Sequence, residues 1–269
     1  MSNEISTEVL WKGVVAGTPR TYGDRRTEDI WRHAIVAGRW EGTLPLQTIL
    51  TPVHLDFEFR VNPQSAAYGR NVSCNGPDLD TMVIGALAGL LNSRNPDRPT
   101  LRLIGQGGQC KSISASKCLV DNDNQTGFTL LVRPGGALPF DESSNEAPLS
   151  FYVGRQSLKT DRRRAVQDTA EQANATGFRA PRNSRIEITL SFAEGLTRNP
   201  LSADWLEAVI DGLGASRVGS DRFFDGPSIQ EFGYDDSVIY RLNCAHVQGM
   251  HAESGLHICT KNIFSASSM

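Results

Sequence analysis

The chain has 269 residues, of which 39% are hydrophobic and 21% charged, and its formal net charge is −3. These values describe a globular protein with room for one large core or two ordinary ones, and they exclude a surface that is basic throughout. The longest apolar run, at residues 82–91, is too short to cross a bilayer, and the first residues lack the features of a signal peptide. We therefore expect a cytoplasmic protein without a membrane contact.

Residues 1–134 predict a first half of alternating strands and helices. The residues at 53–61 (VHLDFEFRV) alternate between apolar and polar side chains and form the clearest strand pattern of the chain. A basic loop at 20–26 precedes the first expected helix. The expected strands and helices are strands at 9–15, 53–61, 101–104, 113–120 and 128–132, and helices at 28–37 and 81–91.

Residues 135–148, rich in Pro, Gly, Ser and acidic side chains, predict a linker. After it, the order of elements restarts in residues 149–269. The expected elements are strands at 149–153, 185–192, 237–242 and 256–259, a basic loop at 159–164, a helix at 165–175 and a helix start at 199–204. The repetition predicts an α+β fold of two similar halves, each a small mixed sheet with helices on one face, paired as a pseudo-dimer. The alternative is two unrelated α+β domains.

Two carboxylates, Asp78 and Asp80, stand at the start of the apolar helix in the first half. Their spacing allows both to face one point, where carboxylate oxygens and water can hold Mg²⁺. A bound Mg²⁺ can activate water and stabilise charge on a phosphate. The alternative is structural, with Asp80 as the helix N-cap and Asp78 as a turn residue.

With these motifs the sequence resembles the RusA family of Holliday junction resolvases, which are small α+β homodimers that cut branched DNA with Mg²⁺. The family pattern includes an Arg-rich loop, an alternating strand and a Pro-Asp-hydrophobic-Asp-Asn helix start that carries a lysine one turn later. An Asp-Asp pair before two closing strands completes it. In the first half, residues 77–80 (Pro-Asp-Leu-Asp) match the acidic motif, whereas Thr81 replaces its Asn and Ile84 stands at the position of the lysine.

The remaining acids of the family pattern are divided between the two halves. The first half has glutamines, at 105–111, where the family has its downstream acidic pair. The second half matches that pair at 235–236, but its helix start keeps one acid, Asp204, with Ser202 in the other position. An alternative register, which aligns residues 211–213 with the family helix, leaves no carboxylate at either position.

The resemblance implies a Mg²⁺-dependent, structure-specific endonuclease that binds branched or duplex DNA in a groove between two RusA-like halves. The catalytic residues that it implies are Asp78, Asp80, Asp204 and Asp236, and the metal ligands are Asp78, Asp80 and Asp236. Three outcomes remain open: the first half cuts alone, the two halves complement each other, or catalysis has been lost and binding kept. The last is a catalytically degenerate nucleic-acid-binding or assembly subunit of a larger complex. A protein-interaction component without a DNA contact is a further alternative.

Basic residues occupy equivalent places in the two halves, next to the expected helix starts. In a pseudo-dimer they would flank one groove and contact phosphates without reading the base sequence. Lys117 joins this set because it matches a basic residue of the family's closing strand. The residues expected to contact nucleic acid are Arg20, Arg25, Arg26, Lys117, Lys159, Arg162, Arg163 and Arg164. The alternative is a solvated basic surface that nearby acids partly neutralise.

The five cysteines are odd in number and irregularly spaced, which argues against a secreted disulfide framework. If the last two strands pair as an antiparallel hairpin, Cys244 can lie opposite Cys259, and His246 opposite His257. Two thiols and two imidazoles would then share one face, which suits a structural Zn²⁺ ion. The alternative is ordinary buried cysteines and polar histidines in a sheet.

Overall fold

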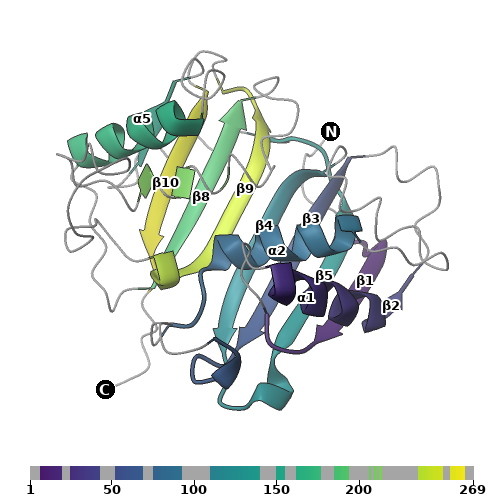
Figure 1. Cartoon of the computed structure of the whole chain (residues 1–269). Helices are drawn as coiled ribbons and strands as arrows, with labels where there is room; N and C mark the ends of the chain where they lie inside the picture. The colour runs from purple at the N-terminus through teal and green to yellow at the C-terminus, as the bar shows by residue number, and fades with distance from the viewer. Residues whose placement is uncertain are drawn as a thin grey trace, which may run out of the picture.

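The computed structural model describes residues 7–19, 25–42, 52–68, 75–92, 110–139, 150–154, 162–176, 185–193, 206, 209–210, 212–213, 236–250 and 255–263. In this part of the chain one mixed sheet of ten strands carries three α-helices with defined bounds (Figure 1). None of the described helices is long and apolar enough to span a membrane.

The strands are β1 (Trp11–Ala16), β2 (Arg39–Glu41), β3 (Val53–Val61), β4 (Cys110–Leu119), β5 (Gly127–Pro134), β6 (Leu138–Pro139), β7 (Ser150–Val153), β8 (Ile186–Ala193), β9 (Ile239–Gln248) and β10 (Leu256–Asn262). The helices are α1 (Arg25–Ala37), α2 (Leu79–Asn92) and α5 (Arg162–Ala175), with short 3₁₀ turns η2 (Ala66–Tyr68), η3 (Asp123–Gln125) and η6 (Asp236–Val238). The prediction for 53–61 is confirmed to the residue. The expected strand at 101–104 and helix start at 199–204 lie outside the described residues.

Counted inward from β1 on one side and from β7 on the other, corresponding strands of the sheet follow the same order. The path runs β2-β1-β5-β3-β4-β9-β8-β10-β7, so that β1-β5-β3-β4 is followed by its mirror order, β9-β8-β10-β7. On each side the two inner strands are parallel (β3 with β4, β8 with β9), and the other pairings along the path within each side are antiparallel. The tenth strand, β6, lies off this path and pairs in parallel with β9. β4 and β9 are antiparallel neighbours and join the two groups. This pairing makes one continuous sheet, of which the small sheets expected for the two halves are parts.

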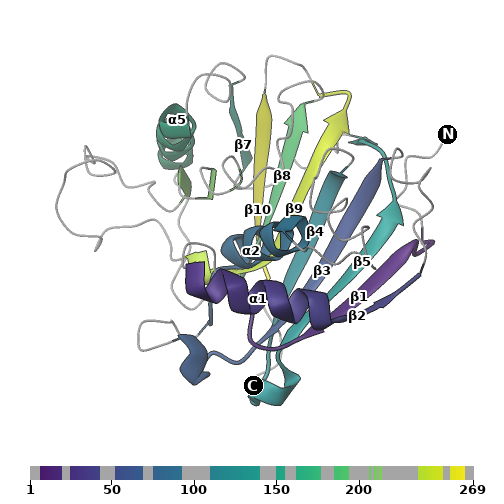
Figure 2. The same ribbon diagram turned by 45° about the vertical axis from the view of Figure 1, so that its right-hand side comes forward.

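The core lies between the sheet and the helices. The apolar residues of β3 alternate onto one face, where Leu55, Phe57, Phe59 and Val61 are fully buried. Figure 2 shows α1 and α2 side by side across this face. Trp31 of α1 and Met82 of α2 are both buried. The sequence of α2 is apolar on nearly every side because the helix packs against both the sheet and α1.

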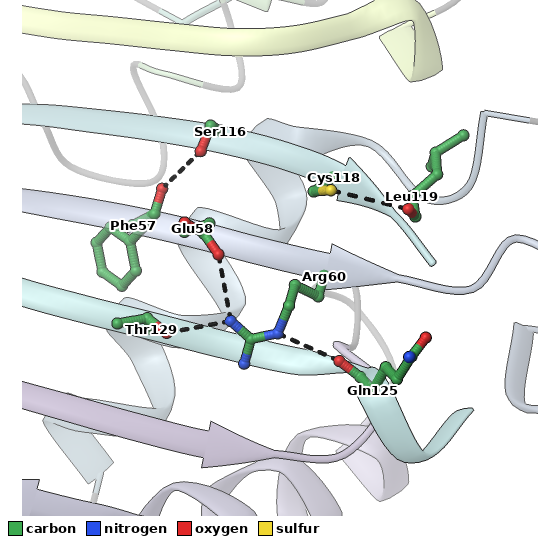
Figure 3. A network of polar contacts seen from close by, with 8 residues as sticks. All are labelled: Phe57, Glu58, Arg60, Ser116, Cys118, Leu119, Gln125 and Thr129. Carbon is green, nitrogen blue, oxygen red and sulfur yellow. Dashed lines mark hydrogen bonds and ion pairs between the residues drawn. The ribbon is translucent and has the colours of Figure 1, made fainter. Parts of the chain in front are cut away.

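The opposite face of β3 is polar. Arg60 of β3 donates hydrogen bonds to Glu58 (3.3 Å), to the hydroxyl of Thr129 (3.1 Å) and to the carbonyl of Gln125 (3.2 Å), as Figure 3 shows. Such cross-strand polar contacts are typical of an antiparallel pair with one solvated face.

Candidate functional site

The first acidic segment, which carries Asp78 and Asp80, leads into the N-terminus of α2. Gly76 has φ of +75°, a left-handed conformation that glycine adopts without strain, and it lets the chain enter the helix. The carbonyl of Asp78 accepts hydrogen bonds from the amide of Met82 (3.2 Å) and the hydroxyl of Thr81 (3.0 Å), which makes Asp78 the N-cap residue. Asp80, expected as a possible cap, lies instead in the first helical turn, which is a favourable place for an acid.

The two carboxylates at this helix start have different exposure. Asp78 is half-buried, whereas Asp80 is 1% exposed. Burial is the main cause that raises the pKa of the Cys244 thiol on β9, and the charges of Cys110 and Asp80 raise it further. Asp80 therefore acts electrostatically on the helix-covered face of the sheet, and Asp78 is the more accessible acid.

The second acidic segment, which carries Asp236, lies near the start of α2 although it is far away along the chain. Asp236 begins η6, which leads directly into β9. Because β9 runs antiparallel to β4, the start of β9 lies beside the end of β4. The chain enters α2 after β3, which is parallel to β4, so that η6 and the start of α2 lie at one end of the sheet (Figure 1).

Lys117 of β4 donates hydrogen bonds to both acidic segments. Its ammonium donates to the carbonyl of Pro77 (3.0 Å) and to the carbonyl of Ser237 (2.7 Å), the residues next to Asp78 and Asp236. Lys117 is 5% exposed, and carbonyl partners of this kind are what a buried ammonium needs. The residue expected to contact DNA thus holds the two segments together from inside the protein.

Tyr240 contacts this lysine, and Asn75 and Arg185 contact Tyr240. None of the three was expected from the sequence. The hydroxyl of Tyr240 donates to Asn75 Oδ1 (3.2 Å). The Tyr240 ring lies under two cations, with Lys117 Nζ 4.8 Å and Arg185 Cζ 4.6 Å from its centroid. Two features of the sequence could have pointed to these residues. Tyr240 follows shortly after the Asp-Asp pair, and Arg185 directly precedes an alternating strand.

The other residues expected at the site are less completely placed. Asp204, Arg20 and Lys159 lie outside the described residues. Arg25 and Arg26 begin α1, and Arg162 and Arg163 begin α5. Arg164 is exposed, and its Nε lies 3.9 Å from Asp168 Oδ2 one turn away.

The pairing expected for the zinc site is wrong. β8 lies between β9 and β10, so that the last two strands form no hairpin. Cys244 faces the helices together with its neighbours Ile113 and Leu190, whereas His257 pairs with Ser191 on the other face. Among the described side chains, which exclude those of Asp204 and Asp236, no three His, Cys, Asp or Glu residues form a group that could hold a metal ion.

Comparisons of the chain with protein-family models, with curated proteins and with solved structures found no match.

Proposed function

We propose that the chain is a Mg²⁺-dependent, structure-specific DNA endonuclease made of two RusA-like units, with one acid site formed jointly by both. The observation that carries the proposal is the position of Lys117, whose ammonium bonds the residue before Asp78 and the residue after Asp236. The acids that the sequence divides between the two halves thus belong to segments that share one lysine.

Matching topology supports the two-unit architecture. The order and sense of β1, β5, β3 and β4 are the same as those of β7, β10, β8 and β9. The antiparallel contact of β4 with β9 is the one expected where two equivalent units meet about a two-fold axis. A tandem duplication accounts for all of these features, whereas two unrelated domains account for none.

The composition of the site suits the proposed ion. Carboxylate oxygens are the ligands that Mg²⁺ prefers, and the ion usually keeps several waters. When bound, it would supply an activated water and stabilise charge on the phosphodiester. In this chain Asp78 and Asp236 would hold the ion on the accessible side of the α2 start, and Asp80 would add negative charge beneath the first turn.

Cleavage of a four-way DNA junction in Mg²⁺ tests the proposal. We expect Asp78→Asn and Asp236→Asn each to reduce cleavage by more than about 100-fold, because losing a metal ligand costs more than losing a supporting residue. Asp168→Asn on α5 is the matched control and should cleave like the wild type. The proposal fails if the wild type cuts no branched or linear DNA in Mg²⁺ or Mn²⁺, or if only one of the two site variants loses activity.

A catalytically degenerate nucleic-acid-binding or assembly subunit is the second candidate. Two observations favour it: Ile84, at the position of the family's lysine, is 2% exposed, and Asp80 is 1% exposed. Such a protein would bind DNA without a divalent ion, with an affinity that falls steeply as salt rises. Binding in EDTA combined with no cleavage would identify it.

A further inference from the structure

We propose that Arg185, lying over the ring of Tyr240, contacts a backbone phosphate of the bound nucleic acid beside the shared acid site. This inference rests on the proposed function for the class of ligand, but it does not require that the ligand be cut. It assigns a binding residue that the sequence comparison with the RusA pattern did not supply.

The backbone at Arg185 is fixed next to the second acidic segment. Its carbonyl accepts a hydrogen bond from the amide of Ile263 (2.6 Å), which ties it to the end of β10. Ile186 pairs in parallel with Ile239, so Arg185 lies at the same end of the sheet as η6. Its position is therefore set by two strands and does not depend on a free loop.

The side chain of Arg185 is exposed and stacked. Its guanidinium carbon lies 4.6 Å from the centroid of the Tyr240 ring. Stacking of a guanidinium on an aromatic face leaves its N–H edge available to bind an anion. The ring therefore restricts the side chain without occupying its hydrogen-bond donors.

Arg185 differs from the other exposed arginines in its surroundings. Arg39, Arg164 and Arg241 each lie within ion-pair distance of a carboxylate. Among the residues that the structure describes, Arg185 has no such pair. Its charge is thus less compensated, and a phosphate group could take the place that a carboxylate takes beside the others.

Tyr240 connects this arginine to the first acidic segment. The ring is 6% exposed, and its hydroxyl bonds to Asn75, two residues before Pro77. The second cation over the ring is Lys117, which bonds the carbonyl of Pro77. The exposed guanidinium is thereby placed beside both acid-bearing segments, where a phosphate held by Arg185 would lie close to a cation held by the acids.

The test measures binding of a fluorescently labelled four-way junction in EDTA over a range of salt concentrations. We expect Arg185→Ala to weaken binding about tenfold and to reduce the salt slope by about one, as for the loss of one phosphate contact. Arg241→Ala is the matched control, because Arg241 is also exposed but is paired with Glu187 on the opposite face. Tyr240→Phe keeps the ring and should bind almost like the wild type, whereas Tyr240→Leu should resemble Arg185→Ala.

The outcomes separate this inference from the proposed function. If the wild type binds without cutting and Arg185→Ala binds more weakly, the inference holds and the nuclease activity does not. If the wild type cuts and Arg185→Ala binds and cuts equally well, the inference is overturned and the nuclease activity stands. Equal weakening by Arg185→Ala and Arg241→Ala, or no DNA binding by the wild type, also overturns it.

Discussion

At the scale of single residues, two histidines are held neutral inside the sheet. His54 is 4% exposed, and its Nδ1 lies 2.7 Å from the hydroxyl of Ser112. Burial, assisted by the charge of Arg133, lowers the pKa of His54 to about 4. Burial, assisted by Lys111, also lowers the pKa of His246 to about 4. The folded protein therefore resists protonation at both positions in a range where the unfolded chain accepts it.

These histidines predict a loss of stability in mild acid. As pH falls from about 6.5 to about 4, the unfolded chain binds protons that the folded protein does not, and the free energy of unfolding decreases. Each histidine should contribute a loss that approaches roughly 3 kcal/mol at pH 4. Urea unfolding at pH 7.5 and pH 5 measures the difference. We expect it to be smaller in His54→Gln and unchanged in His33→Gln, which alters an exposed residue of α1. Equal acid sensitivity in His54→Gln and the wild type would contradict this account.

At the scale of elements, the connection from β4 to β5 passes the end of β3. Asp123 in η3 accepts hydrogen bonds from Asn62 (2.7 Å) and Ser65 (3.0 Å), which follow β3. The chain then enters β5 at Gly127, which has φ of +149°. A Cβ at this position would lie 2.2 Å from the carbonyl oxygen of Val15 on β1. The close approach of β1 and β5 therefore requires glycine here.

We expect Gly127→Ala to lower the free energy of unfolding by about 2 kcal/mol or more, because it combines a strained backbone with a clash against main-chain atoms. Gly136→Ala is the control, since nothing lies within 4 Å of a Cβ at that position. It should change stability by less than about 0.5 kcal/mol. Chemical denaturation of the two variants gives the comparison. Similar stability of both would show that β1 and β5 can separate at little cost.

Local pattern explains which elements the sequence could predict. Alternation at β3 and the apolar run of α2 are properties of adjacent residues, and both elements form where expected. Partner choice is not local, so neither the contact of β4 with β9 nor the insertion of β8 beside β9 could be predicted. The same limit applies to the site, because Lys117 bonds residues 40 and 120 positions away in the chain.

At the scale of the whole molecule, the core continues across the contact of β4 with β9. Ile113 and Ala115 of β4 pair with Cys244 and Leu242 of β9, and all four are buried. Separating the two sides would expose this apolar surface and break the strand ladder. The sheet should therefore unfold as one unit.

A single cooperative transition is the expected result of urea unfolding. Three of the four tryptophans (Trp11, Trp31 and Trp40) lie within residues 1–134, so their fluorescence reports mainly on this half of the chain. Far-UV circular dichroism reports on the helices and strands of both halves. We expect the two signals to give the same midpoint, the usual criterion for two-state behaviour. Distinct midpoints would show that the halves unfold independently.

The two edge strands of the sheet are short: β2 has three residues and β7 has four. β2 also carries the oppositely charged Arg39 and Glu41, which form an ion pair. Short, charged margins give a neighbouring polypeptide little main chain on which to add another strand. So broad a sheet would otherwise be prone to stack edge to edge with copies of itself, and its narrow borders protect it from fibrous self-association.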